Sequence, residues 1–243
     1  MAETVISVKD VKIRYRLLKK ISLLKSMFSL KKFAKTEYFE AVKGISFDVK
    51  KGQILGIVGK NGSGKSTLLR AIAGIFSPDE GTIDLHGHSV SLLSIGVGFT
   101  PALTGRENIF LSGTLLGFTR EQINERIDEI IEFSELGQFI DRPVKTYSSG
   151  MYSKLAFSIT AILETEIMLV DEVLSVGDAK FKAKSFKKMK SLISDSERTV
   201  LIVSHSTDTL QKLCDSILWI HDGEMKMIGT TEEVLPEYIK FMS

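Results

Sequence analysis

The chain has 243 residues, of which 43% are apolar and 26% charged, so it is long enough to bury a sizeable core in one large or two small domains. A net charge of +2, from 32 Lys and Arg against 30 Asp and Glu, argues against a general nucleic-acid-binding protein. The single cysteine, Cys214, excludes an internal disulfide and suits a reducing cytosol. We see neither a secretory signal nor an apolar run long enough for a membrane span, and we expect a chain that does not cross a membrane by itself.

Short apolar runs alternate with helical patterns along the chain, which predicts an α/β fold with a mostly parallel sheet. His86 and His88 are expected in an exposed hairpin, and His221 in a turn, so no zinc site is predicted. The expected strands are 5–8, 45–49, 54–58, 167–170 and 200–203, and the expected helices are 66–73, a helix-rich region from 105 to about 136, and 153–163.

The segment 17–38 interrupts this alternation. Its apolar residues follow helical spacing at Leu17, Ile21, Leu24 and Phe28. Its lysines meet no acidic residue before Glu37; they are Lys19, Lys20, Lys25, Lys31, Lys32 and Lys35. The pattern predicts a basic amphipathic insertion, which is either a solvated charged segment or a surface that docks on a membrane or a partner helix.

A phosphate-binding loop is the strongest signal in the sequence. The motif G-x-x-x-x-G-K-[ST] is matched by Gly59, Lys60, Asn61, Gly62, Ser63, Gly64, Lys65 and Ser66, with Thr67 following in the expected helix. Glycines let backbone N–H groups turn toward phosphate oxygens, and the helix start adds its positive end. Lys65 is expected to reach the β- and γ-phosphates of ATP, and the Ser66 hydroxyl to bind Mg²⁺.

Charged and polar residues follow two further expected strands. Asp171 and Glu172 come after the apolar run 167–170, and His205 follows the run 200–203. Ligands of open α/β sheets bind at these strand ends. We expect Asp171 to hold Mg²⁺, Glu172 to polarise the attacking water, and His205 to contact the γ-phosphate.

The segment Tyr147–Met151 opens a helix between the phosphate loop and the acidic pair. Ser148, Ser149 and Gly150 offer hydroxyl and N–H donors to a phosphate at that helix N-terminus. The order of phosphate loop, this segment, acidic strand and His205 resembles ATP-binding cassette (ABC) ATPases across essentially the whole chain. The segment is a variant of their LSGGQ signature that matches at Ser148 and Gly150 and departs at Tyr147, Ser149 and Met151.

A finer resemblance is carried by YSSGMYSKLAFSI, DEVLSVGDAKFKAK and LTGRENI. These stretches are similar to the ATPase subunits of bacterial exporters of lipid-linked polysaccharide, which carry O-antigen, capsule or teichoic-acid polymers. The Val176-Gly177-Asp178 stretch, in place of the usual Ala-Leu-Asp, is part of that match. The resemblance implies a peripheral subunit on the cytoplasmic face of the bacterial inner membrane, working with two copies of a membrane permease.

The resemblance also implies a fold and a mechanism. It implies one nucleotide-binding domain over 1–243, with an antiparallel β subdomain and a helical subdomain at 100–160 that carries the signature. Two cassettes are expected to pack head to tail, so that the phosphate loop of one and the signature of the other enclose ATP, with Asp178 on the loop that crosses the interface. Adenine is expected to stack on Tyr15, with Tyr38 and Phe39 as competing candidates.

The sequence departs from the family at one position. No Gln occurs from Ile54 through Glu121, where most cassettes have a glutamine that meets Mg²⁺ and the membrane subunit. The equivalent place falls near 94–98, and Phe99 is a candidate for contact with the permease instead.

Three alternatives are weighed against an exporter subunit. A soluble cassette ATPase of translation or DNA maintenance usually has two cassettes or a long coiled coil, and neither is seen here. A scaffold that binds nucleotide without hydrolysis does not fit intact Lys65, Asp171, Glu172 and His205. An importer ATPase commonly carries a regulatory C-terminal domain, and we expect no such domain, nor a carbohydrate-binding one, in this chain.

Overall fold

A computed structural model describes residues 3–17, 37–93, 98–171, 178–193 and 197–242, and it confirms the predicted α/β class. A six-stranded sheet lies at its centre, in the order β5-β6-β7-β3-β8-β9, and is parallel except for the edge strand β9. Its strands are β3 (Ile54–Val58), β5 (Val90–Leu93), β6 (Ile167–Asp171), β7 (Thr199–Val203), β8 (Ser216–His221) and β9 (Glu224–Thr230). The inner strands are continuous apolar runs because helices or a second sheet cover both faces.

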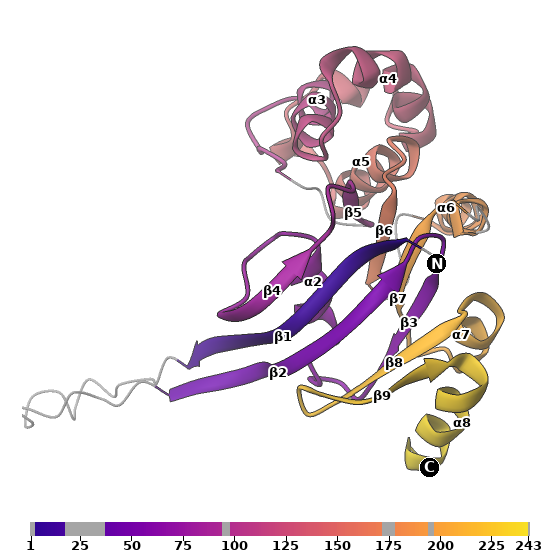
Figure 1. The fold of residues 1–243 in the computed structure, drawn as a ribbon. Helices are drawn as coiled ribbons and strands as arrows, with labels where there is room; N and C mark the ends of the chain where they lie inside the picture. Colours follow the sequence, from indigo (N-terminus) through magenta and orange to yellow (C-terminus); the bar gives the residue numbers. More distant parts are fainter. Residues whose placement is uncertain (1–2, 18–36, 94–97, 172–177, 194–196, 243) are drawn as a thin grey trace, which may run out of the picture.

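A three-stranded antiparallel sheet, β2-β1-β4, packs over one face of the central sheet (Figure 1). Its strands are β1 (Thr4–Leu17), β2 (Glu37–Lys50) and β4 (Glu80–Asp84). Helix α2 (Lys65–Ile72) lies between the two sheets and shares one apolar core with both. Strands β1 and β2 are longer than the runs 5–8 and 45–49 predicted from apolar residues, because their pairing continues outward to Leu17 and Glu37.

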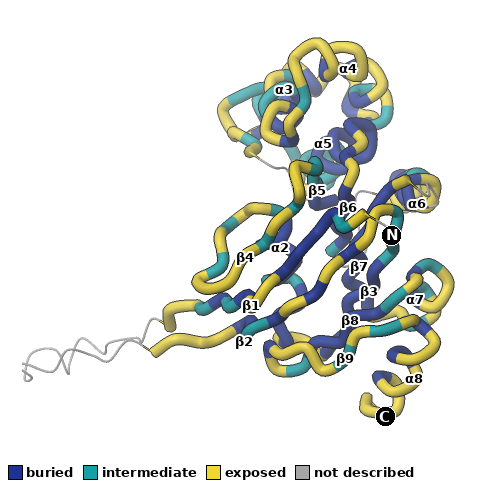
Figure 2. The backbone as a smooth tube through the Cα atoms, in the orientation of Figure 1, coloured by how far each residue is buried: buried dark blue, intermediate teal, exposed yellow. Residues whose placement is uncertain are grey.

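Four helices cover the opposite face of the central sheet and form a second apolar core with it (Figure 2). They are α5 (Ser149–Ile162), α6 (Ala179–Ile193), α7 (Thr207–Leu213) and α8 (Thr231–Met242). Within the described residues, no helix is both long enough and apolar enough to cross a bilayer.

A separate helical region extends from one end of the central sheet (Figure 1). It contains α3 (Gly105–Leu115), α4 (Arg120–Ser134), the short 3-10 turns η1 (Gly137–Asp141) and η2 (Val144–Thr146), and α5, and it buries a third apolar core of its own. Helix α5 contributes Phe157 to the second core and Ile159 to the third, so it joins this region to the sheet. It begins at Ser149 rather than at the predicted residue 153, because the Ser148 side chain caps its first turn.

Two sequence predictions need correction. The expected hairpin at His86 and His88 is wrong, because β4 and β5 belong to different sheets and the segment between them crosses from one to the other. The His88 ring is mostly buried there, with Nδ1 at 2.9 Å from Glu166 Oε1. The expected insertion 17–38 is narrower, because Leu17 ends β1 and Glu37 begins β2; residues 18–36 lie outside the described ranges.

Candidate functional site

The phosphate loop connects β3 to α2 at the carboxyl edge of the central sheet. All three of its glycines have positive φ angles that side chains rarely adopt, and two of them are also closely packed: Gly59, at +154°, and Gly64, at +101°. A Cβ on Gly59 would lie 2.2 Å from the carbonyl oxygen of Ile220, and one on Gly64 would lie 2.2 Å from that of Ala41. The loop therefore needs glycine at both positions, for its backbone angles and for close packing against β8 and β2.

Lys65 bends back over this loop. Its Nζ donates to the carbonyl oxygens of Gly59, at 2.8 Å, and of Lys60, at 2.9 Å, and the residue is only 6% exposed. Burial lowers the pKa of Lys65, while the nearby Asp171 carboxylate acts to raise it. Phosphate oxygens that entered the loop would offer this amine negatively charged acceptors in place of two neutral carbonyls.

Ser66 and Asp171 meet in space although they are far apart in the chain. The Ser66 Oγ donates to Asp171 Oδ1 at 2.8 Å, and the other carboxylate oxygen lies 4.0 Å from an Arg70 guanidinium nitrogen. A hydroxyl and a carboxylate are the hard oxygen donors that suit Mg²⁺, which usually keeps only one or two protein ligands and completes its shell with phosphate and water. No group of three or more His, Cys, Asp or Glu suited to a metal occurs among the described residues, so a site built wholly from such side chains is not seen there.

A pocket of about 370 Å³ opens above the phosphate loop. His205, which follows β7 and is exposed, lines it together with residues of the loop and of α2. The lining consists of Tyr15, Phe39, Ala41, Asn61, Gly62, Ser63, Gly64, Lys65, Ser66, Thr67, Val203 and His205. The structure thus brings the predicted phosphate loop, His205 and an aromatic pair to one cavity.

Two of the three aromatic candidates share this pocket. Tyr15 on β1 lies directly opposite Phe39 on β2, and its hydroxyl is 3.4 Å from Thr67 Oγ1. Tyr38, the neighbour of Phe39 along the strand, lines a second pocket of about 440 Å³, which Phe39 also lines. Adenine stacking on Tyr15 or Phe39 therefore stays a prediction with a suitable cavity, whereas Tyr38 does not line that cavity.

The signature segment lies at the start of α5, away from this pocket. Ser148 Oγ accepts from the Met151 N–H at 3.2 Å, and the Tyr147 hydroxyl donates to the Phe139 carbonyl at 2.7 Å. Among the described residues, the only atom that a Cβ on Gly150 would meet within 4 Å is Ser148 Oγ. Ser148, Ser149 and Gly150 thus form an open N-terminus of a 14-residue helix, but none of them lines the phosphate-loop pocket.

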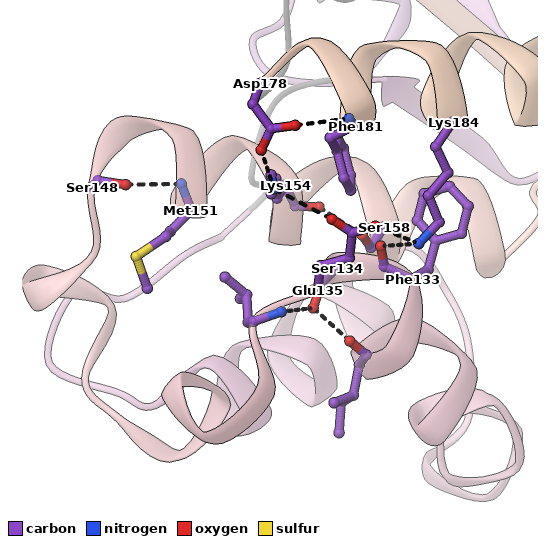
Figure 3. Close-up of polar contacts among 12 residues, drawn as sticks. Phe133, Ser134, Glu135, Ser148, Met151, Lys154, Ser158, Asp178, Phe181 and Lys184 are labelled. Atoms are coloured by element: carbon purple, nitrogen blue, oxygen red, sulfur yellow. Dashed lines mark hydrogen bonds and ion pairs between the residues drawn. The ribbon is translucent and has the colours of Figure 1, made fainter.

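Asp178 is held by the signature helix (Figure 3). Its carboxylate accepts from Lys154 Nζ at 2.8 Å and from the Phe181 N–H at 3.0 Å, which caps α6. The hydrogen bond from Lys154 is the main cause that lowers the pKa of Asp178 to about 2. Lys154 Nζ also lies 3.5 Å from Glu135, which pairs in turn with Lys184 at 3.3 Å.

Sequence reasoning missed Lys154. A usable signal exists, because Lys154 is the only charged residue of α5 in an otherwise apolar and hydroxyl-bearing helix. A lone charge on such a helix is expected to have a partner. Its partners, Asp178 and Glu135, are far from Lys154 along the chain, so the sequence alone does not identify them.

Some predicted residues lie outside the described ranges. These are Glu172, Val176 and Gly177, and residues 94–97 at the place of the missing glutamine. Phe99, just beyond that place, packs edge-on against Tyr152 of the signature helix with ring centroids 4.9 Å apart.

The family model for the ABC transporter matches residues 42–175. An O-antigen export system ATP-binding protein of Klebsiella pneumoniae is 44% identical over 203 residues, covering 84% of this chain and 82% of that protein. A teichoic acids export ATP-binding protein of Enterococcus faecalis is 45% identical over 96% of this chain and 54% of its own length. An O-antigen export system ATP-binding protein of Myxococcus xanthus is 45% identical over 84% of this chain and 46% of its own length. The chain thus spans about half the length of these last two relatives.

Solved structures show the same fold at low sequence identity. An ATP-binding cassette dimer in a post-hydrolysis state, bound to ADP and Pi, has a TM-score of 0.68 at 21% identity, covering 93% of this chain and 98% of that one. An ATP-binding subunit of an ABC transporter has a TM-score of 0.72 at 20% identity, covering 97% and 93%.

Proposed function

Because this chain belongs to the ABC transporter family, we propose that it is the ATP-hydrolysing subunit of a bacterial exporter of lipid-linked polysaccharide. One observation carries the exporter assignment: relatives named for O-antigen export and for teichoic acid export resemble this chain equally well over most of its length. O-antigen and teichoic-acid polymers are therefore candidate cargoes of the complex, and the sequence resemblance adds capsule polymers.

The chain's own residues divide the work on ATP. The phosphate loop holds the β- and γ-phosphates with its backbone N–H groups and with Lys65. To bind these phosphates, the Lys65 ammonium gives up its hydrogen bonds to the carbonyl oxygens of Gly59 and Lys60. The Ser66 hydroxyl and the Asp171 carboxylate, which are in contact at 2.8 Å, would hold Mg²⁺. When bound, Mg²⁺ supplies charge neutralisation at the phosphates.

The residues that activate the attacking water are assigned to the same edge of the central sheet. We assign the general base to Glu172, the neighbour of Asp171, and a γ-phosphate contact to His205, which lines the pocket. Glu172 itself lies outside the described residues, so its role rests on the sequence.

A complete site needs a second copy of the chain. The open helix N-terminus at Ser148–Gly150 offers an anion site that lies away from the phosphate-loop pocket of its own chain. In a head-to-tail dimer it reaches the phosphates bound by the partner, and each ATP is enclosed between two chains. We propose that this dimer works beneath two copies of a membrane permease, on the cytoplasmic face of the inner membrane.

The test of hydrolysis compares the parent with Lys65→Ala and Glu172→Gln. Lys65→Ala should lower Mg²⁺-dependent ATPase activity by about 100-fold or more, because it removes a charge that stabilises the phosphates. Glu172→Gln should abolish turnover but retain ATP binding, so that an ATP-bound dimer accumulates in size-exclusion chromatography. Parent-level hydrolysis by Glu172→Gln would remove Glu172 from the role of general base.

The test of export is made in cells that carry a deletion of this gene. Such cells should accumulate lipid-linked polymer inside, and expression of the parent chain, but not of Lys65→Ala, should restore the polymer to the surface. Chemical analysis of the accumulated polymer identifies the cargo. Normal surface polymer in the deletion strain would instead favour a soluble cassette ATPase or another transporter class.

A further inference from the structure

The C-terminal helix α8 packs behind the phosphate loop. Its Tyr238 is buried, with its ring edge-on to Trp219 of β8 at 5.5 Å between centroids. Burial raises the pKa of Tyr238, and a hydrogen-bond contact with the backbone of Gly59 opposes this rise. Gly59 is the first residue of the phosphate loop, so α8 touches the loop where it leaves β3.

The last turn of α8 touches the next residue of the loop. The Lys60 ammonium lies 5.2 Å from the centroid of the Phe241 ring, within the range of a cation–π contact. The ring is held from behind by Trp219 at 5.1 Å and His221 at 5.0 Å, and Lys226 Nζ lies 3.7 Å from its centroid. Phe241 is therefore packed against these side chains, although it is 40% exposed, and its ring meets the loop at the Lys60 ammonium.

The two loop residues that α8 contacts are the two that hold Lys65. Lys65 Nζ donates hydrogen bonds to the carbonyl oxygens of Gly59 and Lys60, and it has no other acceptor among the described residues. A shift of either peptide unit moves the acceptors that aim the ammonium at the phosphate site. The contacts that α8 makes with the loop can therefore affect the position of the Lys65 ammonium through the carbonyl groups of Gly59 and Lys60.

We propose that α8 is a positioning element for ATP binding, in which Tyr238 and Phe241 hold Gly59 and Lys60 so that the loop and Lys65 are preorganised for phosphate. The proposal rests on the proposed ATP-binding function and adds residues that lie outside the pocket. Tyr238 and Phe241 act through the loop and do not touch nucleotide. Their loss should weaken ATP binding and leave the rate at saturating ATP unchanged, because bound phosphate itself draws the loop and Lys65 into place, so that the cost of lost preorganisation falls on binding.

The test is a double-mutant cycle between Lys60 and Phe241 in the full chain. Phe241→Leu keeps an apolar side chain but removes the ring, and Lys60→Met removes the ammonium. The dissociation constant is measured by equilibrium fluorescence with a methylanthraniloyl-labelled ATP, and KM and kcat by steady-state hydrolysis. Phe241→Leu should raise the dissociation constant and KM by about two- to five-fold, the range for a partly exposed cation–π contact, with kcat unchanged. In the Lys60→Met background the same substitution should have little further effect.

Three further variants separate positioning from general packing. Phe241→Tyr retains a ring and should restore the parent dissociation constant. Tyr238→Phe removes only the hydroxyl beside Gly59 and should raise the dissociation constant. Lys226→Met removes the other cation on Phe241, which is not part of the loop, and should leave nucleotide binding unchanged. Thermal unfolding of each variant checks that it is folded.

The outcomes are distinct. Parent-like nucleotide binding by Phe241→Leu, an equal loss in the Lys60→Met background, or the same loss in Lys226→Met would each overturn the positioning role. A parent chain that binds and hydrolyses no ATP would instead refute the proposed function.

Discussion

Asp178 shows how one side chain can be fixed by two different elements. Its carboxylate accepts from Lys154 on α5 and from the first turn of α6, and the pKa shifts of the two charged partners agree: that of Asp178 falls and that of Lys154 rises. The pair lies at the surface, so its energy is reduced by solvent and salt. Its larger effect is geometric, because it ties the signature helix to the start of α6.

The first prediction concerns the protonation of Asp178. Its folded pKa of about 2 lies below the ordinary value of 3.8. The pair therefore stabilises the folded chain above pH 3.8, and that contribution is lost as pH falls through about 2. Carbon-13 NMR of the Asp178 carboxyl group should give a midpoint near 2 in the parent and closer to 3.8 in Lys154→Met. Lys188→Met, which removes a pair with Glu164 instead, is the control, and an ordinary midpoint in the parent would contradict the prediction.

At the scale of elements, the helices of the helical region begin at hydroxyl caps. Thr104 caps α3 and Thr119 caps α4, each in a reciprocal pair with the residue three positions on, and Ser148 caps α5. These contacts satisfy backbone N–H groups that have no partner within the helix. They set where each helix starts, and for α5 they place the signature at the helix end.

The second prediction is that Thr104→Ala lowers the free energy of unfolding by about 1 kcal/mol, because the Glu107 N–H loses its acceptor. Urea denaturation followed by circular dichroism measures the change. Thr104→Ser keeps the hydroxyl and should retain most of the stability. Equal losses for Ala and Ser would show that the methyl group, and not the cap, carries the effect.

At the scale of the whole molecule, the residues of the proposed ATP site lie on two separate surfaces. The phosphate loop, Asp171 and His205 meet at one edge of the central sheet, while Ser148–Gly150 lie at the end of the helical region. In the proposed function each surface is half of an ATP site, and a symmetric head-to-tail dimer would join one of each kind twice.

The third prediction tests that division by mixing two inactive variants. Lys65→Ala damages the phosphate loop, and Gly150→Asp places a carboxylate at the signature helix N-terminus, where it repels phosphate. A heterodimer retains one intact site, so an equal mixture that pairs at random should recover about one quarter of the parent activity. ATPase assays on each variant and on the mixture measure this. A mixture as inactive as its components, although heterodimers form, would show that the site does not cross the interface.

The phosphate loop and the carboxylate at a strand end could be predicted from the sequence because each depends on residues that are adjacent in the chain. A strand, a glycine-rich loop and a helix from Ile54 to Ile72 follow from composition and spacing, and so does the place of Asp171 at a strand end. Strand pairing could not be predicted in this way: β4 and β5 are close in sequence but join different sheets, because their apolar faces pack into different layers.

The sequence by itself determined the fold class, the family and the phosphate loop, since these depend on local patterns that any tertiary context must accommodate. Only the tertiary structure decided that Lys154 pairs with Asp178, that Phe39 stands opposite Tyr15, and that Phe241 lies against Lys60. Each of these pairs joins residues that are well separated in the chain. Their contact depends on how whole sheets and helices pack, and that packing cannot be predicted from the spacing of neighbouring residues in the sequence.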